Sequence, residues 1–211
     1  EPPQQGIRRL TVKAPADLPV LIMAYKAPVI RDVDKDVDPY ALEMLAAVLA
    51  GHDAARLNNQ LVRQQRLAVS AAASYDSTSR GPGMFFLYGS PSAGKTRAEL
   101  ETGLRAQIAD IQQQGIAREE LARAKAQLIA AQIYKLDSVF GQAMEIGQLE
   151  AIGIPHTQNQ RIIDKLQAVS ADEVQAAARK YLQDEQLTVA ELDPQALPAS
   201  GRPRPTLPSR H

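Results

Sequence analysis

A nearly continuous series of helical segments constrains the fold of this chain more than any other feature of its sequence. From Thr96 to Leu182 the apolar residues recur with helical spacing, and the breaks fall at turn-forming residues such as Gly115 and Pro155. Helices are therefore predicted over about 96–114, 118–136, 138–152, 156–167 and 171–182. Because strands and helices do not alternate here, a doubly wound parallel sheet is disfavoured.

The strands are predicted on either side of this helical region. Short apolar segments that are bounded by turn residues are typical of strands. Five segments fit this description: Arg8–Lys13, Leu18–Ala24, Leu67–Tyr75, Met84–Tyr88 and Leu187–Leu192. Two further helices, one ending at Gly51 and one over 54–65, lie between the second and third strands. This order predicts an α+β fold, a two-layer sandwich in which helices cover one face of a largely antiparallel sheet.

Several residues at the predicted helix ends are typical caps. Asp38 is expected as the N-cap before Pro39, and Gly51 is expected to end that helix in the left-handed conformation. The strongest local signal is a capping box formed by Ser170 and Glu173. These caps predict where the first and last long helices begin.

Composition and charge exclude several classes of function. The 24 basic and 24 acidic residues cancel, and the basic residues are scattered, so nucleic acid is not an expected partner. The chain has no cysteine, which excludes thiolate nucleophiles and cysteine-ligated zinc. No apolar run approaches the roughly 20 residues that span a membrane. We expect one domain over 8–195, an N-terminal extension over 1–7 and a Pro-rich disordered tail over 196–211.

One segment matches the phosphate-binding P-loop pattern. Gly89-Ser-Pro-Ser-Ala-Gly94-Lys95-Thr96 lies between a predicted strand and a predicted helix, so Gly89, Gly94, Lys95 and Thr96 are candidate nucleotide-binding residues. Three observations oppose this alternative. The preceding strand resembles the second arm of a hairpin, Pro91 removes one amide, and no acidic Walker-B strand follows after one helix. The opposing interpretation is a strand, a polar turn and a helix N-terminus.

A run of carboxylates resembles a calcium-binding loop. Counted from Asp32, the acidic residues fall at EF-hand positions 1, 3, 5, 7 and 12, and they are Asp32, Asp34, Asp36, Asp38 and Glu43. Val37 occupies the position where the loop requires Gly, and Pro39 starts the next helix too early. We therefore interpret these acids as charges near a helix N-terminus and predict no metal site.

The chain lacks the residues of a hydrolase that works alone. Histidine occurs only at His52, His156 and His211, and no two are spaced to bind one metal from a helix face. The nucleophile turn Gly-x-Ser-x-Gly is also absent. Its function is therefore expected to be binding a substrate or partner for chemistry carried out elsewhere.

Four groups of residues, taken in order, resemble the pitrilysin (insulinase-like) family of zinc metallopeptidases. They are the segment from Pro28 through Asp38 to Leu49-Ala50-Gly51; Ala55-Arg56-Leu57-Asn58-Asn59-Gln60-Leu61 with Leu67-Ala68; Gly115-Ile116-Ala117-Arg118-Glu119-Glu120-Leu121 with Ala124-Lys125; and Ser170 through Ala178-Arg179-Lys180-Tyr181-Leu182 to Pro194. Each motif is loose, but the order and spacing are specific, and the resemblance covers about residues 8–195.

The resemblance implies a specific division of labour. Members of this family pair two similar halves, in one chain or as separate subunits, around an unfolded peptide. One half binds zinc on His-x-x-Glu-His and a distal Glu, and the other closes the chamber without zinc. This chain resembles the second, C-terminal half, so zinc and catalysis are expected in its partner. Bacterial relatives are often periplasmic, which makes the periplasm the expected compartment. A subunit that acts only as a scaffold is a further alternative.

The chain departs from the family where substrate is expected to bind. The family's zinc-free half often supplies an Arg and a Tyr near the metal, but Val62 and Val69 align with these positions. Arg63, Arg66 and Tyr75 lie nearby and are the candidate substrate-binding residues. Ordinary solvated charge remains the alternative interpretation of the two arginines. Either substrate anchoring is weakened, or this half mainly shapes the chamber wall.

Overall fold

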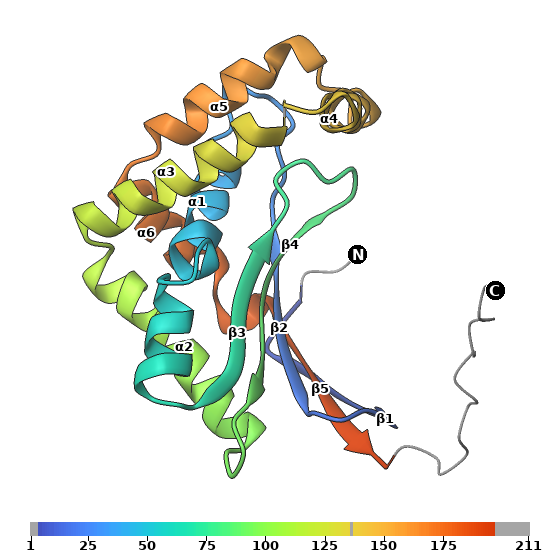
Figure 1. Ribbon diagram of the computed structural model, residues 1–211, viewed down its shortest axis with the longest axis vertical. Coiled ribbons are helices and arrows are strands. Elements are labelled where there is room, and N and C mark those ends of the chain that lie inside the picture. Colours follow the sequence, from blue (N-terminus) through green and yellow to red (C-terminus); the bar gives the residue numbers. More distant parts are fainter. Residues whose placement is uncertain (1–3, 136, 197–211) are drawn as a thin grey trace, which may run out of the picture.

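The protein forms one five-stranded sheet with helices packed on one of its faces (Figure 1). The computed structural model describes residues 4–135 and 137–196. This arrangement confirms the predicted α+β fold with a largely antiparallel sheet. Most of the predicted tail, 197–211, lies outside the described residues.

The strand order in the sheet is β1-β5-β2-β4-β3. The strands are β1 (Arg8–Pro15), β2 (Val20–Ala27), β3 (Ala68–Tyr75), β4 (Gly83–Pro91) and β5 (Leu187–Gln195). Among the strands of the described residues, only the β1–β5 pair is parallel, and the other three pairs are antiparallel. The last strand of the chain therefore lies between the first two. Strands β1 and β3 form the two edges.

The helical layer is built mainly from the segment between β4 and β5. Its elements are α2 (Arg97–Gln114), α3 (Arg118–Lys135), α4 (Val139–Ala151), η2 (His156–Gln158), α5 (Asn159–Ala168), α6 (Ala171–Tyr181) and η3 (Asp184–Gln186). Between β2 and β3 lie α1 (Asp38–Ala50) and the π-helix η1 (Asn58–Gln64). The Ser170–Glu173 capping box is present at α6, and Thr96 and Glu99 form a second one at α2.

The core lies between the sheet and the helices, because alternate strand residues point to that side. In β2 and β4 the inward residues Met23, Tyr25, Phe85 and Leu87 are buried almost completely. Helices α2 and α6 contact these two strands, whereas α1, most of whose residues are also buried, packs on β3. The outward residues of the same strands are more exposed, so the second face of the sheet has no covering layer among the described residues.

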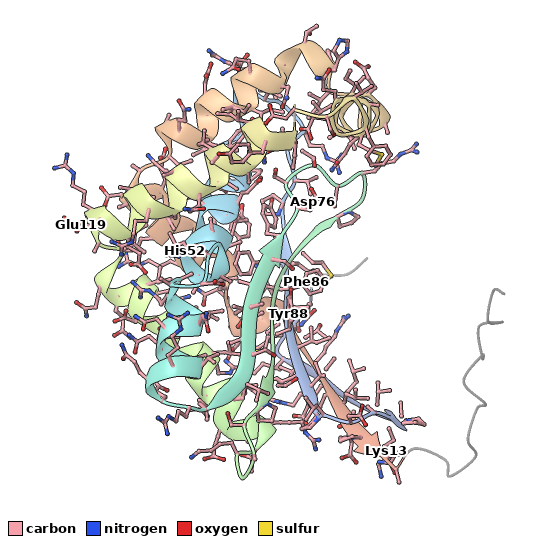
Figure 2. The ribbon with its side chains drawn as sticks, in the orientation of Figure 1. Lys13, His52, Asp76, Phe86, Tyr88 and Glu119 are labelled. Carbon is pink, nitrogen blue, oxygen red and sulfur yellow. The ribbon has the colours of Figure 1, made fainter. Side chains whose placement is uncertain are left out.

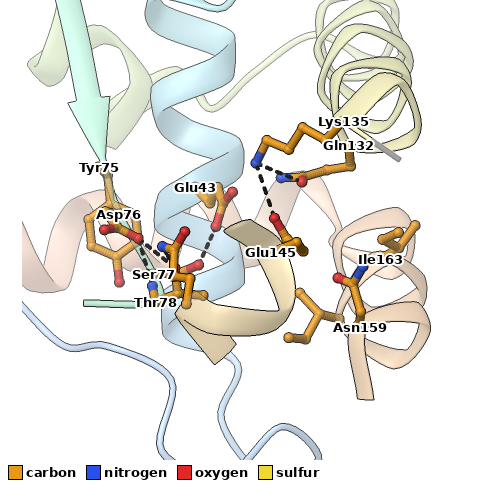
Figure 3. Close-up of a pocket in the computed structure, with 12 residues that line it drawn as sticks. Glu43, Tyr75, Asp76, Ser77, Thr78, Gln132, Lys135, Glu145, Asn159 and Ile163 are labelled. Carbon is orange, nitrogen blue, oxygen red and sulfur yellow. Dashed lines mark hydrogen bonds and ion pairs between the residues drawn. The ribbon is translucent and has the colours of Figure 1, made fainter. Parts of the chain in front are cut away.

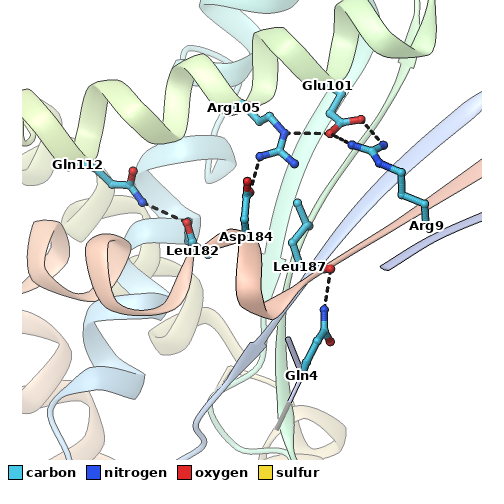
Figure 4. Close-up of polar contacts among 8 residues, drawn as sticks. All are labelled: Gln4, Arg9, Glu101, Arg105, Gln112, Leu182, Asp184 and Leu187. Atoms are coloured by element: carbon cyan, nitrogen blue, oxygen red, sulfur yellow. Dashed lines mark hydrogen bonds and ion pairs between the residues drawn. The ribbon is translucent and has the colours of Figure 1, made fainter. Parts of the chain in front are cut away.

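A charge network joins the edge strand β1 to the helical layer (Figure 4). The carboxylate of Glu101, on α2, accepts two hydrogen bonds from the Arg9 guanidinium at 2.7 and 2.8 Å. It accepts another from Arg105 Nε at 2.9 Å, and Arg105 also donates to Asp184 at 2.6 Å. Because its carboxylate is paired in this way, Glu101 can be buried as a charged group, with only 8% of its surface exposed. The network holds β1 against α2 in addition to its ladder with β5.

Two predicted helix ends are wrong. Asp38 is the first residue of α1 and not its N-cap, because its carboxylate is engaged elsewhere: it accepts hydrogen bonds from Lys180 and Tyr181 of α6. Gly51 has a φ of −68°, so it does not adopt the left-handed conformation.

The predicted α-helix over 54–65 is a turn followed by a π-helix. The amide of Gln65 donates to the carbonyl of Gln60, five residues earlier, at 2.9 Å. Such helices are rare and often lie at functional sites. The sequence carries no separate signal for this wider helix.

Candidate functional site

The open face of the sheet is the first feature with functional potential. Large apolar side chains lie on its strands, with Leu10 46%, Val12 48%, Ile22 36% and Tyr88 41% exposed. Leu10 and Val12 of β1 lie beside Ala190 and Leu192 of β5, so this surface extends across several strands. In Figure 2, Phe86 and Tyr88 mark the position of β4, and His52 marks the side of the sheet that the helices cover. Contiguous apolar surface of this kind marks a binding or interaction site.

The unpaired edge of β3 is the second feature. No other described strand pairs with β3 on the side away from β4. Beside this edge runs a shallow groove with a volume of about 230 Å³, between β3, α1 and α3. Its walls carry mainly small side chains, including Ala46, Ala50, Ala73 and Ala131. Small side chains leave room for an extended chain to approach the free backbone groups of the strand.

Val62 and Val69, which align with the Arg and Tyr of the family pattern, lie in η1 and at the irregular start of β3. The register with β4 shifts between Ala68 and Ser70, which leaves Val69 in a bulge and 55% exposed. Val62, by contrast, is partly buried against the core. Bulges are common beside binding sites because they redirect a side chain. The side chain at position 69 therefore points outward, but it is aliphatic.

The candidate residues Arg63 and Arg66 lie close together in sequence at this end of β3, and both are exposed. Arg66 has a φ of +50°, and among non-glycine residues of the described chain it alone has a positive φ. This conformation costs about 1 kcal/mol for a residue other than glycine. It turns the chain from η1 into β3, so Arg66 lies three residues before the bulged Val69.

Tyr75 lies at the opposite end of β3 from these arginines. Its hydroxyl donates to the carbonyl of Pro28, and its ring stacks on Phe85 with the centroids 6.1 Å apart. Tyr75 is the last of the eight residues of β3, and a strand of this length spans roughly 25 Å. The structure therefore does not bring Tyr75 together with Arg63 and Arg66, and it ties the Tyr75 hydroxyl to the backbone.

The P-loop candidate forms part of a strand and a tight turn. Gly89 lies within β4, which pairs antiparallel with both neighbours, whereas a P-loop follows a parallel strand. The Thr96 hydroxyl and amide contact the Glu99 carboxylate in the α2 capping box, and Lys95 Nζ lies 3.0 Å from the same side chain. Gly94 has a φ of +78°, as the turn requires. This geometry does not match a P-loop, because the groups that would hold phosphate already cap the helix.

The carboxylates of the calcium-loop pattern point to different partners. Asp36 accepts the amides of Arg31 and Asp32, which closes a tight turn. Asp38 binds α6, and Glu43 accepts the hydroxyl of Ser77. Among the described residues, no three His, Asp or Glu side chains gather to hold a metal ion. Within the same residues, no helix is long and apolar enough to cross a membrane.

Glu43, which the sequence placed only in the calcium-loop pattern, lies in the wall of a cavity. Glu43 lines a hollow of about 260 Å³ together with Tyr75, Ser77, Lys135 and Glu145 (Figure 3). Burial raises the pKa of Glu43, and the Ser77 hydrogen bond opposes this effect. The signal in the sequence was an acid at a position of α1 whose neighbours, Leu42 and Met44, are buried.

Comparisons with known proteins give a consistent result. The family profile described as the peptidase M16 inactive domain matches residues 1–128. The uncharacterized zinc protease YmxG of Bacillus subtilis is 29% identical over 146 residues, which is 69% of this chain and 35% of that protein.

Two solved structures share the fold. A protease from Helicobacter pylori has a TM-score of 0.82 at 21% identity, over 92% of this chain and 46% of that one. An inactive peptidase domain from Bordetella parapertussis has a TM-score of 0.76 at 20% identity, over 92% of this chain and 99% of that one. The chain thus spans less than half of YmxG and of the Helicobacter pylori protease chain, and nearly all of the Bordetella parapertussis domain.

Proposed function

Because the chain belongs to the peptidase M16 family as its inactive domain, we propose that it holds an unfolded peptide for cleavage by a zinc-bearing partner half. The observation that carries this proposal is the free edge of β3 beside the groove that α1 and α3 line. An extended peptide that adds to this edge gains main-chain hydrogen bonds, which give affinity without strict sequence preference.

The open sheet face supports a role as the chamber wall. Its exposed apolar residues, including Ile22 and Tyr88, form a surface that an unfolded peptide or the partner half would cover. Arg63 and Arg66 lie just before the edge strand β3, where their charges would attract acidic groups or the carboxylate end of a peptide. Catalysis would come from the partner, where zinc activates the water that attacks the peptide bond.

Peptide binding can be tested by blocking the groove. We expect the chain to raise the fluorescence anisotropy of a labelled unstructured peptide in a saturable way. Ala131→Trp narrows the groove from the exposed side of α3 and should weaken binding about tenfold, because the main-chain hydrogen bonds of the added strand are lost. Ala122→Trp makes the same change on α3 outside the groove and should leave binding unchanged. Equal affinity of the two variants would exclude the groove as the peptide site.

The arginines and the partner need separate tests. Replacing Arg63 and Arg66 together by Ala should weaken the binding of acidic peptides more than that of neutral ones, whereas a pure scaffold would show no change.

The isolated chain should not cleave peptide, and cleavage that a chelator abolishes should appear only with a zinc-bearing half. Zinc-dependent cleavage by this chain alone would contradict the proposal.

The compartment is also a proposal. The family resemblance leads us to propose the periplasm, and cell fractionation followed by detection of this chain tests it. Recovery with cytoplasmic markers alone would contradict this assignment.

A further inference from the structure

The cavity beside Glu43 continues the β3–α3 groove but has a polar lining. Its volume is about 260 Å³, and its walls come from α1, the end of β3 and the following loop, α3, α4 and α5 (Figure 3). Glu43 and Tyr75 line both the cavity and the groove, so the two hollows adjoin. One water takes up about 30 Å³ of liquid, so the cavity has room for a small molecule or a long side chain.

The Glu43 carboxylate has one oxygen available to a ligand. Its Oε2 accepts the hydroxyl of Ser77, whereas Oε1 accepts no hydrogen bond from the described residues. In Figure 3 this second oxygen points away from Ser77, toward the side of the cavity where Lys135 and Gln132 lie. No buried side-chain oxygen or nitrogen of the described residues lacks a hydrogen-bond partner, so this oxygen is accessible from the cavity and not sealed in the core.

The other two carboxylates of the lining already have partners. Asp76 accepts the amide and hydroxyl of Thr78 on one oxygen and the hydroxyl of Ser79 on the other. Glu145 lies 3.8 Å from Lys135 Nζ. Lys135 also donates to the side-chain oxygen of Gln132 at 3.0 Å. Glu43 differs from both, because it has one free oxygen and no Lys, Arg or His of the described residues lies within ion-pair distance of it.

We propose that this cavity binds a primary ammonium group through Glu43. Three acids and one lysine line the cavity, so its charge favours a cation when the acids are ionised. The amides of Gln132, Gln148 and Asn159 also line it and offer further acceptors for the three N–H donors of an ammonium.

Other cations fit this cavity less well. A guanidinium binds best to both oxygens of one carboxylate, and Ser77 already holds one oxygen of Glu43. The lining shows no trio of metal ligands among the described residues.

The ammonium can come from a free amine or from a lysine side chain of a peptide. The second source rests on the proposed function, because a peptide along β3 would reach the cavity where the strand ends at Tyr75. The shared chemistry is one protonated primary amine on an aliphatic chain.

Binding should strengthen as the pH rises, because the ammonium requires ionised Glu43. Burial raises the pKa of Glu43, and the charges of Asp76 and Glu145 raise it further. The Ser77 hydrogen bond and the charge of Lys135 act in the opposite direction. The other titratable group that faces the cavity, Tyr75 of β3, stays neutral because burial raises its pKa. Above the pKa of Glu43 no proton has to leave, whereas below it binding must release one.

The test is calorimetric titration of the chain with n-butylammonium, with butan-1-ol as the neutral control. We expect saturable binding of the amine alone. Glu43→Gln should weaken it about tenfold, because a charge-assisted hydrogen bond is replaced by a neutral one. Lys135→Gln should strengthen it, because a competing cation is removed, and this variant keeps the test valid if Glu43→Gln impairs folding. Glu119→Gln, at an exposed acid of α3, should change nothing.

A second arm separates the two sources of the amine. Two labelled peptides that differ only in lysine or norleucine are compared. Stronger binding of the lysine peptide, lost in Glu43→Gln, supports a side-chain pocket, and equal binding leaves a free amine as the ligand. If n-butylammonium binds but neither peptide does, the peptide-holding function fails and the ammonium site stands. No saturable amine binding, or no difference between wild type and both cavity variants, would overturn the inference.

Discussion

A glycine in β4 should respond to substitution in the opposite way from a glycine on a helix surface. A Cβ placed on Gly89 would lie 2.5 Å from the carbonyl oxygen of Ser70 in the neighbouring strand and 3.4 Å from a methyl group of Leu100. Neither neighbour can easily move away from this Cβ, because Ser70 contributes backbone in a paired strand and Leu100 is fully buried in the core. A Cβ on Gly147 of α4 would meet nothing within 4 Å.

The geometry sets the size of the expected effect. Relieving the contact with Ser70 requires a shift of about 0.9 Å, since ordinary van der Waals contact begins near 3.4 Å. Overpacking of this kind costs about 1–3 kcal/mol, and a weakened ladder hydrogen bond adds about 1 kcal/mol. Alanine returns about 0.5–1 kcal/mol of backbone entropy. Gly89→Ala should therefore lower the free energy of unfolding by about 2 kcal/mol, and Gly147→Ala should raise it by about 0.5–1 kcal/mol.

Urea unfolding followed by circular dichroism measures both effects. The midpoints should move in opposite directions while the slope of the free energy with denaturant stays constant, since neither change alters the surface exposed on unfolding. A Gly89→Ala midpoint at or above that of wild type would refute the clash. It would also mean that lack of space for a Cβ does not explain why Gly89 stands at the first position of the P-loop pattern.

Three further predictions follow from contacts in the helical layer and at the α2 N-terminus. The Arg9 guanidinium holds the pKa of Glu101 below its ordinary value. The pairing of Glu101 with Arg9 therefore stabilises the fold at neutral pH, and this contribution is lost as the pH falls through the pKa of Glu101. Unfolding at several pH values should show Glu101→Gln less stable than wild type at neutral pH, and the difference in the free energy of unfolding should shrink in acid. A difference independent of pH would contradict this prediction. Arg56→Met should cost roughly 1–3 kcal/mol by thermal unfolding, because Arg56 is largely buried and donates two hydrogen bonds to Glu120 at 2.7 and 2.9 Å. Arg123→Met, at an exposed position of α3, the helix that carries Glu120, is the control. Calorimetric titration with magnesium and ATP should show no saturable heat for wild type or Lys95→Ala, and saturable binding lost in that variant would restore the nucleotide alternative.

Local patterns were sufficient to predict most elements. The helix predicted over 118–136 is found as Arg118–Lys135, and the strand predicted from Met84 extends over Gly83–Pro91. These segments obey rules that act within a few residues, such as apolar periodicity and capping, so their signals are complete in the sequence. The capping box at Ser170 is of the same kind.

The features that were missed depend on partners far away in the chain. Asp38 looked like a cap because the residues that engage its side chain, Lys180 and Tyr181, are more than 140 positions away. The groove arises where β3, α1 and α3 meet, and the cavity where α4 and α5 join them, and no local signal reports such contacts. Tyr75 was placed with the arginines because it is near them in sequence, but a strand separates them by its whole length.

The position of β5 between β1 and β2 sets an order for folding during synthesis. The first two described strands do not pair with each other. Residues 187–195, almost the last part of the described chain, supply the one described partner of β1 and the second partner of β2, which also pairs with β4. Contacts this distant in sequence are slow to close, because the intervening loop is long. Until β5 emerges from the ribosome, Leu10, Val12 and the edge of β2 remain open to other chains. A growing chain of this protein is therefore expected to depend on chaperones at the stage when most of its helices have already formed.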